Sequence, residues 1–75
     1  MLRAKARFME FQLKAEFIEL DNALKVMNLV SSGSEAKQCI QSGLVKINRE
    51  AETRIRRKLR LGDFVEFGEY QIRIT

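Results

Sequence analysis

The sequence predicts an α+β fold in which two short helices pack on a small, mostly antiparallel sheet. Two segments repeat their apolar residues at intervals of three and four, which is the helical period, and each follows a residue that can cap a helix. After Gly43 the period changes to two, which is typical of strands. The chain has 75 residues, of which 45% are hydrophobic and 32% are charged. These are ordinary globular values, so we expect one domain with one core.

The first helix is predicted over residues 22 to about 29, with Asp21 as its N-cap. Its apolar stripe consists of Leu20, Ala23, Leu24, Met27 and either Leu29 or Val30. Lys25 falls off this stripe, so we expect it to face solvent near the end of the helix, where a cation suits the helix dipole.

The second helix is predicted to begin after Ser32, because Ser32 and Glu35 match the capping box. It is expected to end before Gly43, the left-handed residue that commonly follows a helix, with Leu44 as its apolar partner. The residues expected on its inner face are Ala36, Cys39 and Ile40, and those expected on its outer face are Ser34, Lys37, Gln38 and Gln41. Cys39 is therefore interpreted as a core residue.

The strands are predicted from alternation and from turn residues. Val45 and Ile47 alternate with polar residues and are followed by a turn at residues 48–50. After a turn at residues 62–63, residues 64–67 and 70–74 form a hairpin, in which Gly68 takes the first loop position of a type II′ turn. Tyr70, Ile72 and Ile74 are expected to face the core.

Residues 54–61 alternate in a different way, with a row of cations on one side. Arg54, Arg56, Lys58 and Arg60 would point outward, and Ile55, Leu59 and Leu61 inward, with only Arg57 breaking the pattern. In an extended chain the four cations would form a row of about 20 Å. A helical turn would keep Ile55 and Leu59 together as well, so the pattern leaves the secondary structure of this segment open.

The charge of the chain is concentrated in this central region. The net charge is +4 overall, but residues 37–60 contain eight basic and two acidic residues. A localised positive field favours a polyanionic partner, because Lys and Arg release counterions from phosphates. The start of the second helix adds free amides that favour phosphate as well.

Several functional classes are excluded by composition. The chain has no His and a single Cys, which removes the usual zinc sites, His-based triads and an internal disulfide. We therefore expect no enzyme activity, no metal, no cofactor and no small-molecule substrate. Without a long apolar stretch or a signal peptide, the expected location is the cytoplasm rather than a membrane. Residues 1–8 fit none of the predicted elements and are interpreted as a disordered extension or an upstream start, which leaves residues 9–75 as the domain.

Several motifs together resemble a known family. They are I-E-L-D-N-A-L-K-V, S-G-S-E-A-K-Q-C-I, S-G-L-V-K-I-N and L-G-D-F-V-E-F. In this order they are similar to the RNA-binding domain named after ribosomal small-subunit protein four, also called the alpha-L motif. E-T-R-I-R-R-K-L-R-L-G-D and F-G-E-Y-Q-I-R-I resemble more narrowly the short bacterial proteins that consist of this domain alone.

The resemblance implies two helices packed on a small sheet, with a shallow basic face that binds structured RNA of the ribosomal or transfer RNA class. Lys37 matches a basic position on the second helix of the family, and Arg54, Arg56, Arg57 and Lys58 match the basic motif of its short members. The chain departs from the family at Glu19, where many members have a basic residue, and at Arg49, where many have Gly.

The sequence thus predicts a monomeric protein that recognises RNA by its phosphates and shape. Association with the ribosome is part of this hypothesis. The candidate RNA-binding residues are Lys25, Ser34, Lys37, Arg49, Arg54, Arg56, Arg57, Lys58 and Arg60. Base stacking is not expected, because Tyr70 and most Phe residues are assigned to the core. Two alternatives stay open. One is a helix-turn-helix DNA binder that uses Ser34, Lys37 and Gln41, and the other is a module that binds an acidic protein surface.

Overall fold

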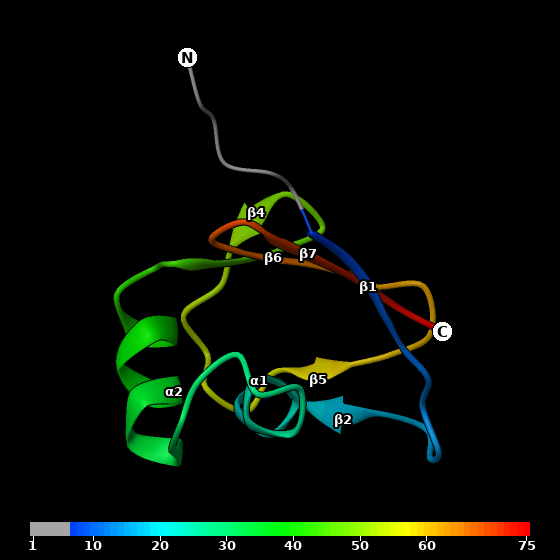
Figure 1. Ribbon diagram of the computed structural model, residues 1–75, viewed down its shortest axis with the longest axis horizontal. Coiled ribbons are helices and arrows are strands. Elements are labelled where there is room, and N and C mark those ends of the chain that lie inside the picture. The colour runs from blue at the N-terminus through cyan, green and yellow to red at the C-terminus, as the bar shows by residue number, and fades with distance from the viewer. Residues whose placement is uncertain (1–6) are drawn as a thin grey trace.

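A five-stranded sheet forms one layer of the computed structural model, which describes residues 7–75 (Figure 1). Its strands are β1 (Arg7–Phe11), β3 (Val45–Ile47), β4 (Glu50–Ala51), β6 (Phe64–Phe67) and β7 (Tyr70–Ile74), in the order β1-β7-β6-β3-β4. The second layer contains α1 (Leu20–Val26) and a ribbon of β2 (Ile18–Glu19) with β5 (Lys58–Leu59), and α2 (Gly33–Gln41) lies at one side of it. The predicted architecture of two helices on a mostly antiparallel sheet is confirmed.

The core lies between these two layers. It consists of Leu20, Ala23, Leu24, Val30, Ala36, Ile40, Val45, Ile47, Leu59, Val65, Ile72 and Ile74. The predicted apolar stripe of the first helix supplies four of these residues, and the alternating residues of β3, β6 and β7 supply five. Val65 pairs with Ile72 and Ile47 with Val65, so the sheet presents one continuous apolar face to the helices.

Helix α1 begins one residue before its predicted N-cap, and the assignment of Asp21 to that position is wrong. The N-cap is Glu19, which makes no hydrogen bond to the helix through its side chain. The first helical amides instead donate to backbone carbonyls of a distant segment: Leu20 to Arg57 at 2.8 Å and Asp21 to Ile55 at 3.1 Å. A segment far along the chain therefore satisfies the helix end, and local sequence rules cannot anticipate such a cap.

Helix α1 also ends earlier than predicted, at Val26 rather than near Leu29. Asn28 adopts the left-handed conformation with φ at 60°, which stops the helix. Leu29 still packs partly against the core and Val30 is buried. The predicted apolar residues therefore face the core, although the helix ends before them.

Helix α2 agrees closely with its prediction. The amide of Glu35 donates to the Ser32 hydroxyl at 3.1 Å, as a capping box requires. The return bond differs, because the Glu35 carboxylate accepts from the amide and hydroxyl of Ser31, at 2.8 and 2.7 Å. These bonds lower the pKa of Glu35.

The end of α2 is a Schellman motif. Gly43 has φ at 77°, its amide donates to Ile40, and the amide of Leu44 donates to Cys39. Leu44 is 57% exposed, so it contributes little to the core, and its predicted contact with the last turn of α2 stays a prediction.

Both predicted hairpin turns are present. Asn48 and Arg49 link β3 to β4 with positive φ values of 53° and 79°, so Arg49 occupies a backbone conformation that suits Gly better. Gly68 has φ at 61° between the paired residues Phe67 and Tyr70, as the type II′ turn requires.

Strand β1 corrects the predicted start of the domain. Arg7 and Phe8, which were assigned to the extension before the domain, belong to this strand, and residues 1–6 lie outside the described part of the chain. The strand runs parallel to β7, with Met9 opposite Ile72, and both Met9 and Phe11 pack against the core. No helix within residues 7–75 is long and apolar enough to cross a membrane.

Candidate functional site

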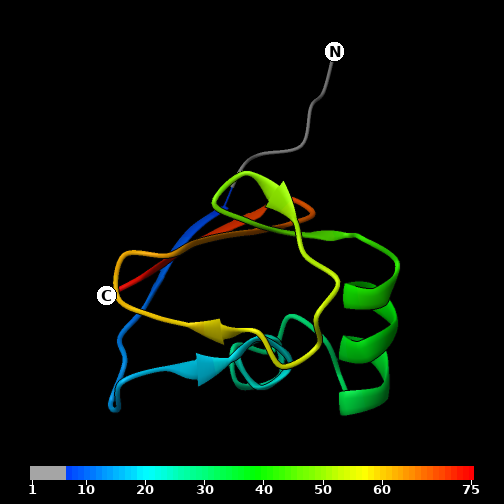
Figure 2. The same ribbon diagram turned by 180° about the vertical axis from the view of Figure 1, so that it is seen from behind.

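Residues 52–60, named here the basic loop, run from the end of β4 through β5. The first part of the loop passes α2 on the way to the N-terminal end of α1 (Figure 2). The loop is not the extended row considered from the sequence. It turns at Ile55 and Arg56, where the amide of Arg57 donates to the carbonyl of Arg54 at 3.3 Å. The turn is fixed by the two carbonyls that cap α1, so the helix end determines where the loop bends.

The exposed and buried residues of the basic loop mostly agree with the predicted outward and inward positions. The four alternating cations, Arg54, Arg56, Lys58 and Arg60, are exposed, Ile55 is half-buried and Leu59 is completely buried. Leu61 is the exception, because it lies in the turn that precedes β6 and is 75% exposed instead of facing the core.

The bend gathers four cations around one open depression. It has a volume of about 610 Å³ and is lined by Arg54, Arg56, Arg57 and Lys58. Four positive groups around a shallow surface can attract an anion with several charges, since each phosphate of a polyanion can meet a separate cation.

Arg57, which breaks the alternation in the sequence, is the anchor of the loop. Its side chain is only 24% exposed, and its guanidinium contacts Asp63 at 2.8 Å, the carbonyl of Lys58 at 3.0 Å and Glu52 at 3.7 Å. It lines the depression while these contacts hold it in place.

Asp63 completes this anchor from the other side. Its carboxylate also accepts from the side-chain amide of Asn48 at 3.0 Å and from the backbone amide of Arg60 at 2.9 Å. Partial burial acts to raise the pKa of Asp63, but these bonds and Arg57 outweigh it, and the pKa is lowered. The β3–β4 turn and the basic loop are thereby joined through one carboxylate.

Arg54 is held by Glu52 in a bidentate pair. Its Nε and Nη2 atoms each lie 2.9 Å from a Glu52 oxygen, and its backbone amide donates to the same carboxylate at 2.9 Å. The hydrogen bond from the Arg54 side chain is the main reason that the pKa of Glu52 falls from 4.5 to about 2. The Arg54 side chain remains 75% exposed, so the pair orients the guanidinium without burying it.

This shift predicts acid sensitivity of the fold. Because the folded pKa of Glu52 is depressed, its stabilising contribution is present above about pH 4.5 and is lost as the pH falls toward about 2. We expect the free energy of unfolding to decrease across this window, and Glu52→Gln to be less stable near neutral pH and to have a flatter profile below it. Urea unfolding at a series of pH values measures both effects. Parallel profiles for the two proteins would contradict the assignment.

Phe17 adds an aromatic contact that the sequence reasoning missed. Lys58 Nζ lies 4.7 Å and Arg60 Cζ 5.4 Å from the centre of its ring. Arg56 approaches Glu19 at 3.8 Å, so the acidic residue that departs from the family pattern pairs with a cation of the loop. Phe17 lies directly before β2, and the pairing of β2 with the distant β5 brings its ring to the basic loop, so the local sequence contained no signal for this contact.

A second group of candidate residues lies on the helices. Lys25, Ser34 and Lys37 are exposed as predicted. The Nζ atom of Lys25 would lie 3.9 Å from a Cβ atom added to Gly33, so its ammonium group reaches the first residue of α2. Ser34 is the next residue and Lys37 follows within one turn, which brings these three residues together at the start of α2.

Arg49 is placed differently from the other candidates. Its guanidinium lies 3.8 Å from Glu66 and 6.0 Å from the ring of Phe64. Both partners project from the side of the sheet that faces away from the core, so Arg49 contacts this outer face rather than the basic loop.

The aromatic residues also differ from the prediction. Phe11, Phe67 and Tyr70 pack against the core, but Phe8 is 76% exposed, and Phe17 and Phe64 each lie against two cations. The assignment of most Phe residues to the core is therefore wrong for these three. In β6, Val65 is buried and Phe67 packs against the core, so alternation along the strand was the available signal that Phe64 lies on the opposite side.

Comparison with known proteins agrees with the fold and the motifs. The S4 domain family matches residues 11–75. The Bacillus subtilis protein named "Probable ribosome maturation protein RlbA" is 36% identical over 63 residues, which cover 80% of this chain and 89% of that protein. Escherichia coli YbcJ is 34% identical over 62 residues, which cover 83% of this chain and 89% of YbcJ.

The solution structure of YbcJ provides a comparison in three dimensions. It is described as having an alpha-L motif involved in RNA binding, and it matches this chain with a TM-score of 0.70 and 32% identity, over 100% of this chain and 96% of YbcJ. The resemblance seen in the sequence motifs is confirmed, and this chain belongs to the S4 domain family and has the alpha-L fold.

Proposed function

We propose that this protein binds structured RNA through the basic loop and the exposed cations at the start of α2. The observation that carries the proposal is the depression lined by four cationic residues, in a protein of the S4 domain family. Its relative YbcJ is described as containing a motif involved in RNA binding, which supports the same ligand.

The chemistry of the loop suits the phosphates of a folded RNA. Arginine presents a planar fork of donors that matches a phosphate, and two of the three arginines that line the depression are oriented by the carboxylates of Glu52 and Asp63. Side chains that are held in place before binding lose less conformational entropy when the ligand arrives. The loop therefore offers a fixed pattern of positive charge to a fixed pattern of phosphates.

The start of α2 supplies a further set of donors. Its free amides and the helix dipole favour an anion, and Lys25, Ser34 and Lys37 surround this helix end. Because the basic loop runs past α2 toward α1, one RNA backbone can contact both groups (Figure 2). Recognition of this kind reads shape and phosphate spacing, as is common for double-stranded RNA.

Within structured RNA, we assign the ligand more narrowly to the ribosomal or transfer RNA class. It is supported by the name of the relative RlbA, which refers to ribosome maturation. We further propose that the protein is a monomeric binder in the cytoplasm, associated with ribosomes or their precursors, and that it has no catalytic activity of its own.

The proposal is tested by measuring the affinity for a blunt RNA hairpin, a DNA duplex of equal length and a single strand across a range of salt concentrations. We expect preference for the hairpin, with a salt dependence that corresponds to roughly four to six phosphates. Preference for the DNA duplex would favour the helix-turn-helix alternative. Equal binding to all three, or none, would contradict the proposal and point to an acidic protein partner.

A further inference from the structure

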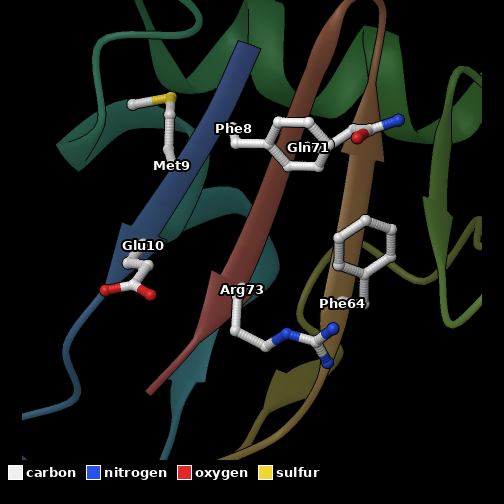
Figure 3. Close-up of a pocket in the computed structure, with 6 residues that line it drawn as sticks. All are labelled: Phe8, Met9, Glu10, Phe64, Gln71 and Arg73. Carbon is white, nitrogen blue, oxygen red and sulfur yellow. The ribbon is translucent and has the colours of Figure 1, made fainter. Parts of the chain in front are cut away.

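The outer face of the five-stranded sheet carries a second hollow, distinct from the basic loop. It has a volume of about 440 Å³ and is lined by Phe8, Met9, Glu10, Phe64, Gln71 and Arg73 (Figure 3). The register places Phe8 opposite Gln71 and Arg73 opposite Phe64, so residues of β1, β7 and β6 form one surface. Their neighbours Val65 and Ile72 are buried, so this surface faces away from the core.

Two aromatic rings, Phe8 and Phe64, line this hollow. Phe8 is the most exposed large apolar side chain of the described residues, at 76%. On the neighbouring side the guanidinium of Arg73 lies 5.0 Å from the centre of the Phe64 ring, and Figure 3 shows Arg73 reaching toward that ring. A nucleobase can stack both on an aromatic ring and on a guanidinium plane.

The polar groups of the hollow fit the edge of a base. Gln71 lies on β7 opposite Phe8 of β1 and Glu66 of β6, and its amide offers both a donor and an acceptor. Glu10 offers acceptors for an exocyclic amino group. Arg49, Arg73 and Lys46, which lies opposite Glu66, exceed Glu10 and Glu66 by one positive charge, so this face has little net charge. A nearly neutral surface with aromatic and amide groups suits a base better than a run of phosphates, in contrast to the basic loop.

We infer that this hollow binds an unpaired nucleobase of the RNA, which stacks against Phe8 and against the Arg73–Phe64 pair, with Gln71 at its hydrogen-bonding edge. The inference rests on the proposed function, because it adds a site for a single-stranded segment to a protein that binds a folded RNA. It extends that function by assigning the ligand of the outer face as an unpaired base rather than a phosphate.

The two sites are separated by comparing a blunt RNA hairpin with the same hairpin carrying a single-stranded extension of about ten nucleotides. We expect the extension to increase affinity about fivefold to a hundredfold, which corresponds to stacking of a base on an aromatic side chain. Because the outer face has little net charge, the ratio of the two affinities should change little with salt, while each affinity falls.

The decisive variant is Phe8→Ala, which should abolish most of the gain from the extension and leave binding of the blunt hairpin unchanged. Phe64→Leu keeps the apolar bulk, removes the ring and should give the same loss. The matched control is Val26→Ala, since Val26 is 60% exposed on α1, in the layer on the other side of the sheet. Thermal unfolding of each variant checks that the fold is retained.

The outcomes distinguish the two proposals. If the unmodified protein fails to bind the blunt hairpin, the proposed function is wrong. If it binds the hairpin but gains nothing from the extension, or if Phe8→Ala and Phe64→Leu keep the gain, the base-binding site alone is overturned.

Discussion

Replacement of Arg54, Arg56 and Lys58 together by alanine is expected to weaken binding to a structured RNA about a hundredfold near physiological salt. These three cations line the depression and are exposed. The loss of three phosphate contacts should also reduce the slope of log affinity against log salt by about three. Fluorescence anisotropy with a labelled RNA hairpin measures both quantities.

Alanine is preferable to a charge reversal at these positions. Arg54 pairs with the carboxylate of Glu52 at 2.9 Å. A glutamate in place of Arg54 would face this carboxylate, and the repulsion between the two would disturb the loop. A matched control replaces Arg7, Lys14 and Lys46 by alanine, which removes the same charge from exposed positions outside the basic loop. If the control weakens binding as much as the loop variant does, net charge rather than the arrangement of the loop determines affinity.

The largest effect on stability is expected for Leu59→Ala. Leu59 is completely buried and pairs with Ile18 across the β2–β5 ribbon, although it lies between the exposed cations Lys58 and Arg60. Removal of a buried leucine side chain leaves a cavity, and the expected decrease in the free energy of unfolding is about 2 to 5 kcal/mol. In a domain of this size that is a large part of the total stability. Urea unfolding followed by circular dichroism measures it.

Leu61→Ala is the control for this prediction. The two leucines are two residues apart and have the same place in the sequence alternation, but Leu61 is 75% exposed. We expect a change within about 0.5 kcal/mol for Leu61→Ala. Equal destabilisation by both substitutions would show that the alternation holds through residue 61 and that the turn before β6 is placed wrongly.

The parts of the fold that depend on neighbours in the sequence were predictable. Helix α2 is determined by the Ser32 cap and by Gly43, and the β6–β7 hairpin by Gly68, all of which act over a few residues. Two of the predictions that failed depend on distant partners. The N-terminal end of α1 is capped by the carbonyls of Ile55 and Arg57, and β1 pairs in parallel with β7, at the other end of the chain.

The candidate site shows the same division. Alternation identified the exposed cations of the basic loop, because inward and outward positions follow from burial of Ile55 and Leu59. It could not reveal that Arg57 is anchored by Asp63 and Glu52, since those contacts arise from the bend of the loop. Nor could it place Arg49 on the outer face, where Glu66 and Phe64 meet it.

The most direct test of the central claim is a nuclear magnetic resonance titration of the ¹⁵N-labelled protein with a blunt RNA hairpin. If the basic loop and the start of α2 form the RNA-binding surface, the largest amide shifts will occur at residues 54–60 and 33–37, with little change in β1. Shifts that are confined to other parts of the chain, or the absence of shifts at saturating RNA, would contradict the account.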